Sequence, residues 1–599
     1  MVMPWQRVLM RLYRGMPTWL RVVLAVASVA LGAVIVIRPT TALDVLALLM
    51  GGAMVLTGIL EPAERVSSSR REPLRLLLSA LWIAGGLFVL ISPALTVRLV
   101  AALVGGLLLL NGFLGLLGVF REDSPWDRRI ADAAFSLSGL LFGALALTWP
   151  DITLLVVAVV FGAWLIMRGV ADLWTIVRAR RDAASSARFA PVRRWGRTVV
   201  ALGAVALAVA TVGLTAPLRE GSPVVDEFYA APRDVPDEPG RLVRAEEFTR
   251  DVPADARGWR ILYTTTGMDG GVRVASGLVV VPAEGDGDWP VVDWNHGTTG
   301  FAEHCAPSLQ VKPFWSGAMF VLREVIANGW ALVATDYIGL GTEGPHPYLI
   351  GPPSAYASLD AVRAARELDD ADLSTKTVVW GHSQGGGAAL WTGALAREYA
   401  PDVFVRGVAA LAPAADPAAL VGRMREITGG SIFAAFAFAS YEAVYSDVRY
   451  RDYIRPGVET IVRAMADRCL SDPGTVLSVV ADLGSQSDPQ IFARPPTSGP
   501  LGQHLSDNRP PERGLSPVLV MQGGRDSVIT PATQQRLVGR MCEAGMRVDY
   551  RLYEGYEHVE LVELRRERPV ADLLEWTAAR FEGRLVPRGC AEQVLEREG

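Results

Sequence analysis

Residues 377–387 read TVVWGHSQGGG, and this stretch decides the fold class of the second half of the chain. The β-branched run before Gly381 is typical of a buried strand, and the residues after Gly387 have a helical pattern. Between them lies the only G-x-S-x-G match in the chain. Small residues at these positions permit a strained turn that lifts a serine hydroxyl above a sheet. We therefore predict Ser383 as a nucleophile, against the alternative of a plain glycine-rich turn.

Outward from this turn, short β-rich runs alternate with helical patterns. We expect strands over 260–265, 272–282, 291–296, 331–336, 377–382, 405–412, 517–522 and 548–553. Helical patterns fill 315–328, 355–369, 385–399 and 533–545. A βαβα order after an opening antiparallel pair predicts a mostly parallel sheet covered by helices on both faces. Residues 259–599 are thus an α/β domain, and 218–258, rich in Pro, Asp, Glu and Arg, are its linker and lead-in.

A serine nucleophile needs a base and an acid, and strand ends supply candidates for both. His558 follows the last expected strand, and Asp526 follows the strand 517–522. This chain order of serine, acid and histidine is the order of α/β-hydrolases, in which the acid orients the histidine. The alternatives are a surface-loop histidine and an aspartate that caps a helix. Asp336 and Glu554 are rival acids.

Two backbone N–H groups should stabilise the charge that develops on the substrate oxygen. One is expected from Gln384, directly after the nucleophile. The other is expected from Thr298, in the loop after the strand 291–296, with Thr299 as the neighbour that could replace it. The alternative is that this loop is only a structural turn.

About 100 residues separate two consecutive strands of the expected sheet, which is far more than a normal connection needs. We assign this insertion, about 415–512, as a helical cap over the active site. It contains the apolar run 431–439, SIFAAFAFA. Phe436 and Phe438 are expected to contact an acyl chain, although the run could also be plain helical core.

The first 217 residues differ from the rest in charge and hydrophobicity. They carry 21 arginines against 11 acidic residues, whereas 218–599 carry 37 basic and 52 acidic residues. Apolar stretches of bilayer-spanning length cover 20–37, 42–60, 74–92, 96–118, 132–149, 152–174 and 198–217. Eighteen arginines lie on one set of connecting loops and two on the other. The positive-inside rule then places the N-terminus in the cytoplasm and, after seven spans, residue 218 outside.

The first six spans also repeat, because Pro39, Pro93 and Pro150 each have a glycine seven residues before and glycines twelve and nineteen residues after. The unit is a helical hairpin whose glycines let neighbouring helices approach closely. This triplicated hairpin, over about residues 20–176, resembles the HdeD family of small multi-pass membrane proteins. The resemblance implies a stress-associated membrane module; few ionisable residues lie inside the spans, so we favour anchoring over transport.

The second half resembles the secretory lipase family over about residues 226–595. The segments that carry the likeness are 295–300 (NHGTTG), 305–308 (CAPS), 336–341 (DYIGLG), 344–348 (GPHPY) and the elbow 381–385. The resemblance implies a capped α/β-hydrolase acting on acylglycerols and other carboxylic esters, with Ser383, Asp526 and His558 as its triad. The family is usually free and secreted, so the membrane module is a departure from it.

All four cysteines lie in the part placed outside, where an oxidising setting favours disulfides. Four cysteines allow three pairings. The resemblance implies Cys305 with Cys469 and Cys542 with Cys590. Neither a metal-ligand spacing nor a phosphate-binding loop is present, so we expect no metal and no cofactor. The absence of a basic tract with aromatics argues against nucleic acid as a partner.

These features together predict an integral membrane protein whose catalytic domain lies on the extracytoplasmic side and acts as a serine esterase or lipase. Its substrate would be a lipid or another acyl ester, and the oligomeric state is open. Within the same fold, an acyltransferase or a peptidase would use the same triad. In a different class, the chain would be a membrane stress or transport protein whose hydrolase-like domain only binds a ligand.

Overall fold

The computed structural model describes residues 18–37, 126–148, isolated positions between 55 and 173, and 224–597 apart from 425, 428–429, 472–490, 515, 564–566 and 587. The chain divides into two compact units. The first comprises Met1–Arg219, Ile454–Ile461 and Val480–Ile491, and the second comprises Glu220–Tyr453, Val462–Val479 and Phe492–Gly599.

Two long helices are described in the first unit, α2 (Thr18–Ile37) and α6 (Trp126–Thr148). They coincide with the expected spans 20–37 and 132–149. The other expected spans, 42–60, 74–92, 96–118, 152–174 and 198–217, fall mainly or wholly outside the described residues. No helix among the described residues combines the length and the apolar character needed to cross a membrane.

The second unit contains one mixed sheet, which in the described part of the chain has ten strands in the order β1-β2-β3-β5-β4-β6-β7-β8-β9-β10. Their bounds are β1 Leu242–Glu247, β2 Ala256–Thr266, β3 Val272–Pro282, β4 Trp289–Asn295, β5 Ala331–Ile338, β6 Leu373–His382, β7 Phe404–Leu411, β8 Val518–Gly523, β9 Val548–Tyr553 and β10 Cys590–Leu595. β1, β2, β3 and β5 pair antiparallel, and the pairs from β5 through β4 to β10 are parallel. The carboxyl ends of β4, β6, β8 and β9 therefore lie along one edge of the sheet.

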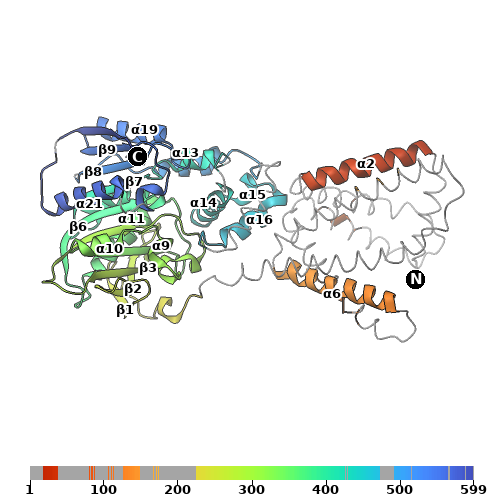
Figure 1. The fold of residues 1–599 in the computed structure, drawn as a ribbon, viewed down its shortest axis with the longest axis horizontal. Helices are drawn as coiled ribbons and strands as arrows, with labels where there is room; N and C mark the ends of the chain where they lie inside the picture. The colour runs from red at the N-terminus through yellow and green to blue at the C-terminus, as the bar shows by residue number, and fades with distance from the viewer. Residues whose placement is uncertain are drawn as a thin grey trace. The chain divides into compact units, whose positions relative to one another are not determined.

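Helices cover both faces of this sheet (Figure 1). The bounds of these helices are α9 Pro313–Ser316, α10 Leu322–Ala327, α11 Gly351–Ala365, α12 Gln384–Tyr399, α19 Pro531–Glu543, α20 Glu560–Glu563 and α21 Arg568–Phe581. On β6, Trp380 packs with residues of α10 and α21, whereas its neighbour Val379 packs with residues of α12 and α19. This two-residue alternation buries the strand on both sides, which explains its continuous apolar sequence.

The segment between β7 and β8 forms a separate helical layer, the cap. Its helices are α13 Pro417–Arg423, α14 Gly430–Val444, α15 Tyr450–Tyr453, α16 Pro456–Ala466 and α18 Gly499–Asp507. These elements fall within the insertion expected over 415–512.

The structure differs from the expected elements at three places. The helix expected over 315–328 is split into α9 and α10, because Ala318 between them has a φ of 59° and cannot continue a helix. β1 lies inside the stretch 218–258 that was expected to be linker and lead-in. β10 was not expected, since five of its six residues are exposed and it lacks the alternation of a half-buried strand.

Candidate active site

Ser383 lies in a sharp turn between β6 and α12. Its φ of 57° and ψ of −117° belong to a region that non-glycine residues rarely adopt, at a cost of about 1–3 kcal/mol. The flanking glycines are required by close packing. A Cβ on Gly381 would overlap the carbonyl group of Gly385, and a Cβ on Gly385 would overlap the carbonyl group of Asn295.

The turn is held by the neighbouring strand β7 and the residues after it. The Ser383 N–H donates to the Leu411 carbonyl oxygen at 2.9 Å. The Ser383 carbonyl oxygen accepts from the N–H of Ala414 at 2.8 Å and of Gly387 at 3.2 Å. These bonds hold the strained conformation, while the serine side chain stays partly exposed.

Asp526 and His558 meet at the same edge of the sheet. Asp526 follows β8, His558 follows β9, and His558 Nδ1 lies 2.7 Å from Asp526 Oδ2. Asp526 Oδ1 accepts the N–H groups of Val528 and Ile529 at 2.9 and 2.8 Å. The carboxylate is buried and fixed by these donors, so it can hold the imidazole in the tautomer that leaves Nε2 unprotonated.

The residue before the serine joins the elbow to the histidine loop. The ring centroids of His382 and His558 are 4.7 Å apart, and His382 Nε2 lies 3.0 Å from the His558 carbonyl oxygen. Burial, followed by the nearby His558, lowers the pKa of His382 to about 3. His382 is therefore neutral, donates to this carbonyl group and positions the loop of His558 beside Ser383.

The other histidines and acids are engaged elsewhere. Burial lowers the pKa of His296 to about 4 and that of His346 to about 3. His504 pairs with Asp447 in the cap at 2.9 Å. The rival acid Asp336 accepts from Ser276 Oγ at 2.7 Å and Ser308 Oγ at 2.5 Å. The other rival, Glu554, packs against Gly524.

The loop after β4 packs directly against the elbow. A Cβ placed on Gly297 would lie 3.4 Å from the His382 carbonyl oxygen and 3.8 Å from Ser383 Cβ. Thr298 therefore lies next to the serine, and its Oγ1 is 3.0 Å from the hydroxyl oxygen of Tyr348. Gln384 begins α12, and its side-chain Nε2 lies 3.2 Å from His346 Nε2. The two residues expected to stabilise the oxyanion are thus on opposite sides of Ser383 in the chain but close to it in the fold.

Two disulfides join the pairs that the resemblance implies, Cys305–Cys469 and Cys542–Cys590. The first lies beside the loop that carries Thr298, because a Cβ on Gly300 would overlap Cys305 Sγ. Next to it, the Leu470 N–H donates to the Thr299 carbonyl oxygen at 2.8 Å. This disulfide therefore fastens a cap segment to the loop.

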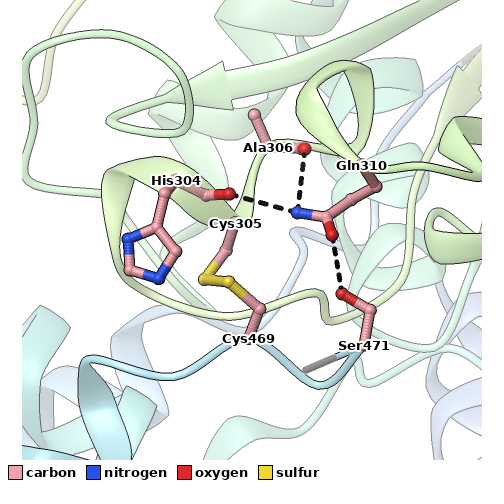
Figure 2. The surroundings of a disulfide bond; sticks show 6 residues. All are labelled: His304, Cys305, Ala306, Gln310, Cys469 and Ser471. Atoms are coloured by element: carbon pink, nitrogen blue, oxygen red, sulfur yellow. Dashed lines mark hydrogen bonds between the residues drawn. A yellow bond between two sulfur atoms is a disulfide. The ribbon is translucent and has the colours of Figure 1, made fainter. Parts of the chain in front are cut away.

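Figure 2 shows the surroundings of this disulfide, where Gln310 Nε2 donates to the His304 carbonyl oxygen at 3.1 Å and Ser471 Oγ donates to Gln310 Oε1 at 2.9 Å. Ligand atoms of His304, Cys305 and Cys469 lie within 4.8 Å of one another. Both sulfur atoms are consumed by the disulfide, so the cluster cannot hold a metal ion through thiolates.

The structure separates the two phenylalanines expected to contact substrate. Both lie on α14 and are fully buried. Phe436 packs edge-to-face on Tyr348 at 5.9 Å, towards the loop of Thr298. Phe438 packs within the cap against an aromatic cluster formed by Tyr450, Tyr453 and Phe492. Residues two apart on a helix point to nearly opposite faces, so this placement does not favour Phe438 as a substrate contact.

The sequence did not indicate that Tyr348 contacts Thr298 at this site. The segment 344–348 was noted only as part of a family likeness. Its tyrosine reaches Thr298, fifty residues earlier in the chain, only through the packing of the sheet and cap. The Pro-rich, aromatic composition of the segment was a signal of an ordered loop, but it did not indicate what the loop contacts.

A mostly parallel sheet whose strand ends carry a serine in a strained turn and a histidine paired with a buried aspartate defines the second unit as an α/β-hydrolase fold. Residues 315–588 match the family described as Secretory lipase. Residues 23–91, 77–144 and 134–212 each match a short repeat of unknown function, DUF308, which fits the internal repeat of the first half.

Relatives and solved structures agree with this assignment. A probable inactive lipase of Mycobacterium tuberculosis is 26% identical over 395 residues, covering 60% of this chain and 83% of that protein. A secreted triacylglycerol lipase of Malassezia globosa is 25% identical over 353 residues, covering 56% and 74%. The closed-state structure of Candida antarctica lipase A has a TM-score of 0.50 at 18% identity, covering 62% of this chain and 90% of that one, and it shows the fold alone. Residues 315–588 are therefore similar to the secretory lipases in sequence, and the second unit shares their fold.

Proposed function

We propose that this protein is a membrane-anchored serine esterase or lipase that hydrolyses carboxylic esters on the extracytoplasmic side through an acyl-enzyme. The observation that carries the proposal is the 2.7 Å contact between His558 Nδ1 and buried Asp526, directly beside the strained turn of Ser383. Strain of this kind is retained where the surrounding structure and a function require it.

In the proposed acylation step, Ser383 Oγ attacks the ester carbonyl carbon while His558 Nε2 accepts the hydroxyl proton. Asp526 stabilises the imidazolium ion through the bond at Nδ1. The oxyanion accepts hydrogen bonds from the backbone N–H groups of Gln384 and Thr298. The alcohol then leaves with the proton held by His558, and the acyl group stays on Ser383.

Deacylation repeats this sequence with water as the nucleophile. His558 takes a proton from the water molecule, and the hydroxide attacks the acyl-enzyme carbonyl carbon. When the second tetrahedral intermediate collapses, His558 returns the proton to Ser383 Oγ and the carboxylic acid is released. The ester and water are the only reactants, and the imidazole of His558 carries the proton in both steps.

For the substrate, we propose an acyl ester whose chain lies beneath the cap, against the face of α14 that carries Phe436. Two features support an apolar acyl group: the helix has an uncharged, largely apolar sequence up to Tyr441, and the relative from Malassezia globosa is named a secreted triacylglycerol lipase. A buried apolar face beside a nucleophile favours substrates that gain from leaving water.

Membrane anchoring and orientation rest on the sequence of the first half. Its arginines gather on alternate loops, and the hairpin repeat is matched three times by the same family. The two disulfides of the second half support an oxidising compartment. Both observations agree with an N-terminus in the cytoplasm and a catalytic unit on the extracytoplasmic side. This topology requires an odd number of spans before residue 218.

A fluorophosphonate probe tests the catalytic part of the proposal on the full-length chain in detergent. We expect the probe to label wild-type protein at Ser383, and the Ser383→Ala variant to remain unlabelled with an unchanged melting temperature. A folded wild-type chain that neither labels nor hydrolyses p-nitrophenyl butyrate would favour a ligand-binding role without catalysis. The Mycobacterium tuberculosis relative is named a probable inactive lipase.

A further inference from the structure

Residues 346–349 touch both sides of the proposed oxyanion hole. His346 Nε2 lies 3.2 Å from the side-chain nitrogen of Gln384, and the Tyr348 hydroxyl lies 3.0 Å from Thr298 Oγ1. Because burial keeps His346 neutral and its Nδ1 lies 3.2 Å from the Ile338 carbonyl oxygen, Nε2 is free to accept from Gln384.

The same four residues are bound to cap helix α14. Ser440 Oγ donates to the His346 carbonyl oxygen at 2.9 Å, and the Tyr441 hydroxyl donates to the Leu349 carbonyl oxygen at 3.0 Å. The ring of Tyr348 packs against Phe436 of α14 at 5.9 Å. Three residues on two successive turns of the helix therefore determine where this segment lies.

Tyr348 is suited to transmit this position to Thr298. Its side chain is 1% exposed, so its place is set by packing and not by solvent. Burial raises the pKa of its phenol above the ordinary value, so the group keeps its proton and remains a hydrogen-bond donor. The Thr298 side chain forms a hydrogen bond with this hydroxyl, and the residue before it, Gly297, packs against the elbow.

We propose that Tyr348 is a positioning residue that couples the seating of cap helix α14 to the oxyanion loop through its hydrogen bond to Thr298. The inference rests on the proposed function, since it assumes that the Thr298 N–H binds the oxyanion. Tyr348 does not touch the reacting atoms. It acts by holding Thr298 in the place where its N–H faces the developing charge, so its loss lowers turnover and leaves ground-state binding of the ester unchanged.

The test compares Tyr348→Phe, Thr298→Val and the double variant in the full-length chain in detergent, with p-nitrophenyl butyrate as substrate. Each single variant should lower kcat about tenfold, less than the loss of an oxyanion donor itself, with KM changed less than twofold. The double variant should be no worse than either single one, because both remove the same bond. Thr298→Ser keeps the hydroxyl and should restore most of kcat.

Tyr263→Phe is the matched control. Its buried hydroxyl also pairs with a threonine, Thr335 Oγ1 at 2.6 Å, but within the sheet between β2 and β5. This variant should lower the melting temperature and leave kcat unchanged. Tyr441→Phe removes a bond between α14 and the segment, and should lower kcat in the same direction as Tyr348→Phe.

The outcomes separate this inference from the proposed function. Wild-type kcat in Tyr348→Phe, or additive losses in the double variant, would overturn the coupling while fluorophosphonate labelling of Ser383 still supports the hydrolase. If wild-type protein is not labelled, the proposed function itself fails. Should Tyr348→Phe not fold, the comparison of Thr298→Val with Thr298→Ser decides the same point.

Discussion

Ser383 occupies a positive-φ conformation between two glycines that have no room for a side chain. A Cβ on Gly381 would overlap the carbonyl group of Gly385, and a Cβ on Gly385 would overlap that of Asn295. The pattern of small residues around the serine is therefore a steric requirement, and it made the strained turn at Ser383 predictable from the sequence. Its proposed partners Asp526 and His558 were predictable because each follows a parallel strand.

The first prediction concerns the triad. Ser383→Ala and His558→Ala should each lower kcat by about a millionfold. Asp526→Asn should lower it by about ten-thousandfold, because the aspartate orients the base and stabilises its imidazolium ion but takes part in no bond making or proton transfer. Initial rates on p-nitrophenyl butyrate and melting temperatures measure both effects. Wild-type turnover in Ser383→Ala with unchanged melting would show that the nucleophile is wrongly assigned.

A second prediction concerns Asp293, a carboxyl group on β4 that the proposed mechanism does not use. It is fully buried, accepts from Ser358 Oγ at 2.7 Å, and its Oδ1 has no partner among the described residues. Burial raises its pKa from 3.8 to about 8. Folding must therefore bind a proton between these values, and the wild type loses stability as the pH rises through this window.

Asp293→Asn removes this proton uptake. Its stability relative to wild type should increase by about 1.4 kcal/mol for each pH unit from pH 4 to 8 and then stay level. Urea midpoints followed by tryptophan fluorescence measure the difference. Asp286→Asn, in an exposed loop, is the control and should show no such slope. A difference that does not change with pH would mean that Asp293 is ionised in the folded protein.

At the scale of helices and strands, a buried strand could be predicted from the sequence and an exposed one could not. β6 is buried along most of its length and was expected at nearly the right place. β10 was missed because its exposed residues carry no period, and it pairs with β9 beside the Cys542–Cys590 disulfide. The break between α9 and α10 could not be foreseen, because an alanine gives no sequence signal for the positive φ that Ala318 adopts.

The third prediction uses the two faces of α14. Phe436→Ala should lower the ratio of octanoate to acetate ester hydrolysis at least threefold, because the acyl chain is proposed to lie against that face. Phe438→Ala should leave this ratio unchanged. It should instead cost about 3–5 kcal/mol of stability, because its ring fills the cluster with Tyr450, Tyr453 and Phe492.

Chain-length profiles and melting temperatures of both variants decide between the faces. Equal losses of the ratio in the two variants would indicate general damage to the cap. A changed ratio in Phe438→Ala alone would place the acyl chain on the other side of α14.

At the scale of the whole molecule, the chain forms two compact units, and the first takes in Ile454–Ile461 and Val480–Ile491 besides Met1–Arg219. The boundary expected at residue 217 rests on composition, with arginine-rich loops before it and an acidic excess after it, and this difference could not indicate that later segments join the first unit. Which side of a membrane the second unit occupies depends on the number of spans, and a composition difference alone does not decide this number.

The fourth prediction therefore concerns topology. Residues 230–239 form no regular secondary structure, and most of them, including Arg233, are exposed in the second unit. If seven spans precede them, trypsin added to intact cells should cut this stretch and give two fragments on a denaturing gel, one of which keeps residues 1–219 in the membrane. The weakest step is the last expected span, 198–217, because its Ala-rich sequence is less apolar than a Leu-rich one.

Protection of the chain until the membrane is opened would mean that this span does not cross. The catalytic unit would then lie in the reducing cytosol, where the disulfides Cys305–Cys469 and Cys542–Cys590 would not persist. Free thiols in the same sample would therefore be independent evidence that the catalytic unit is cytosolic.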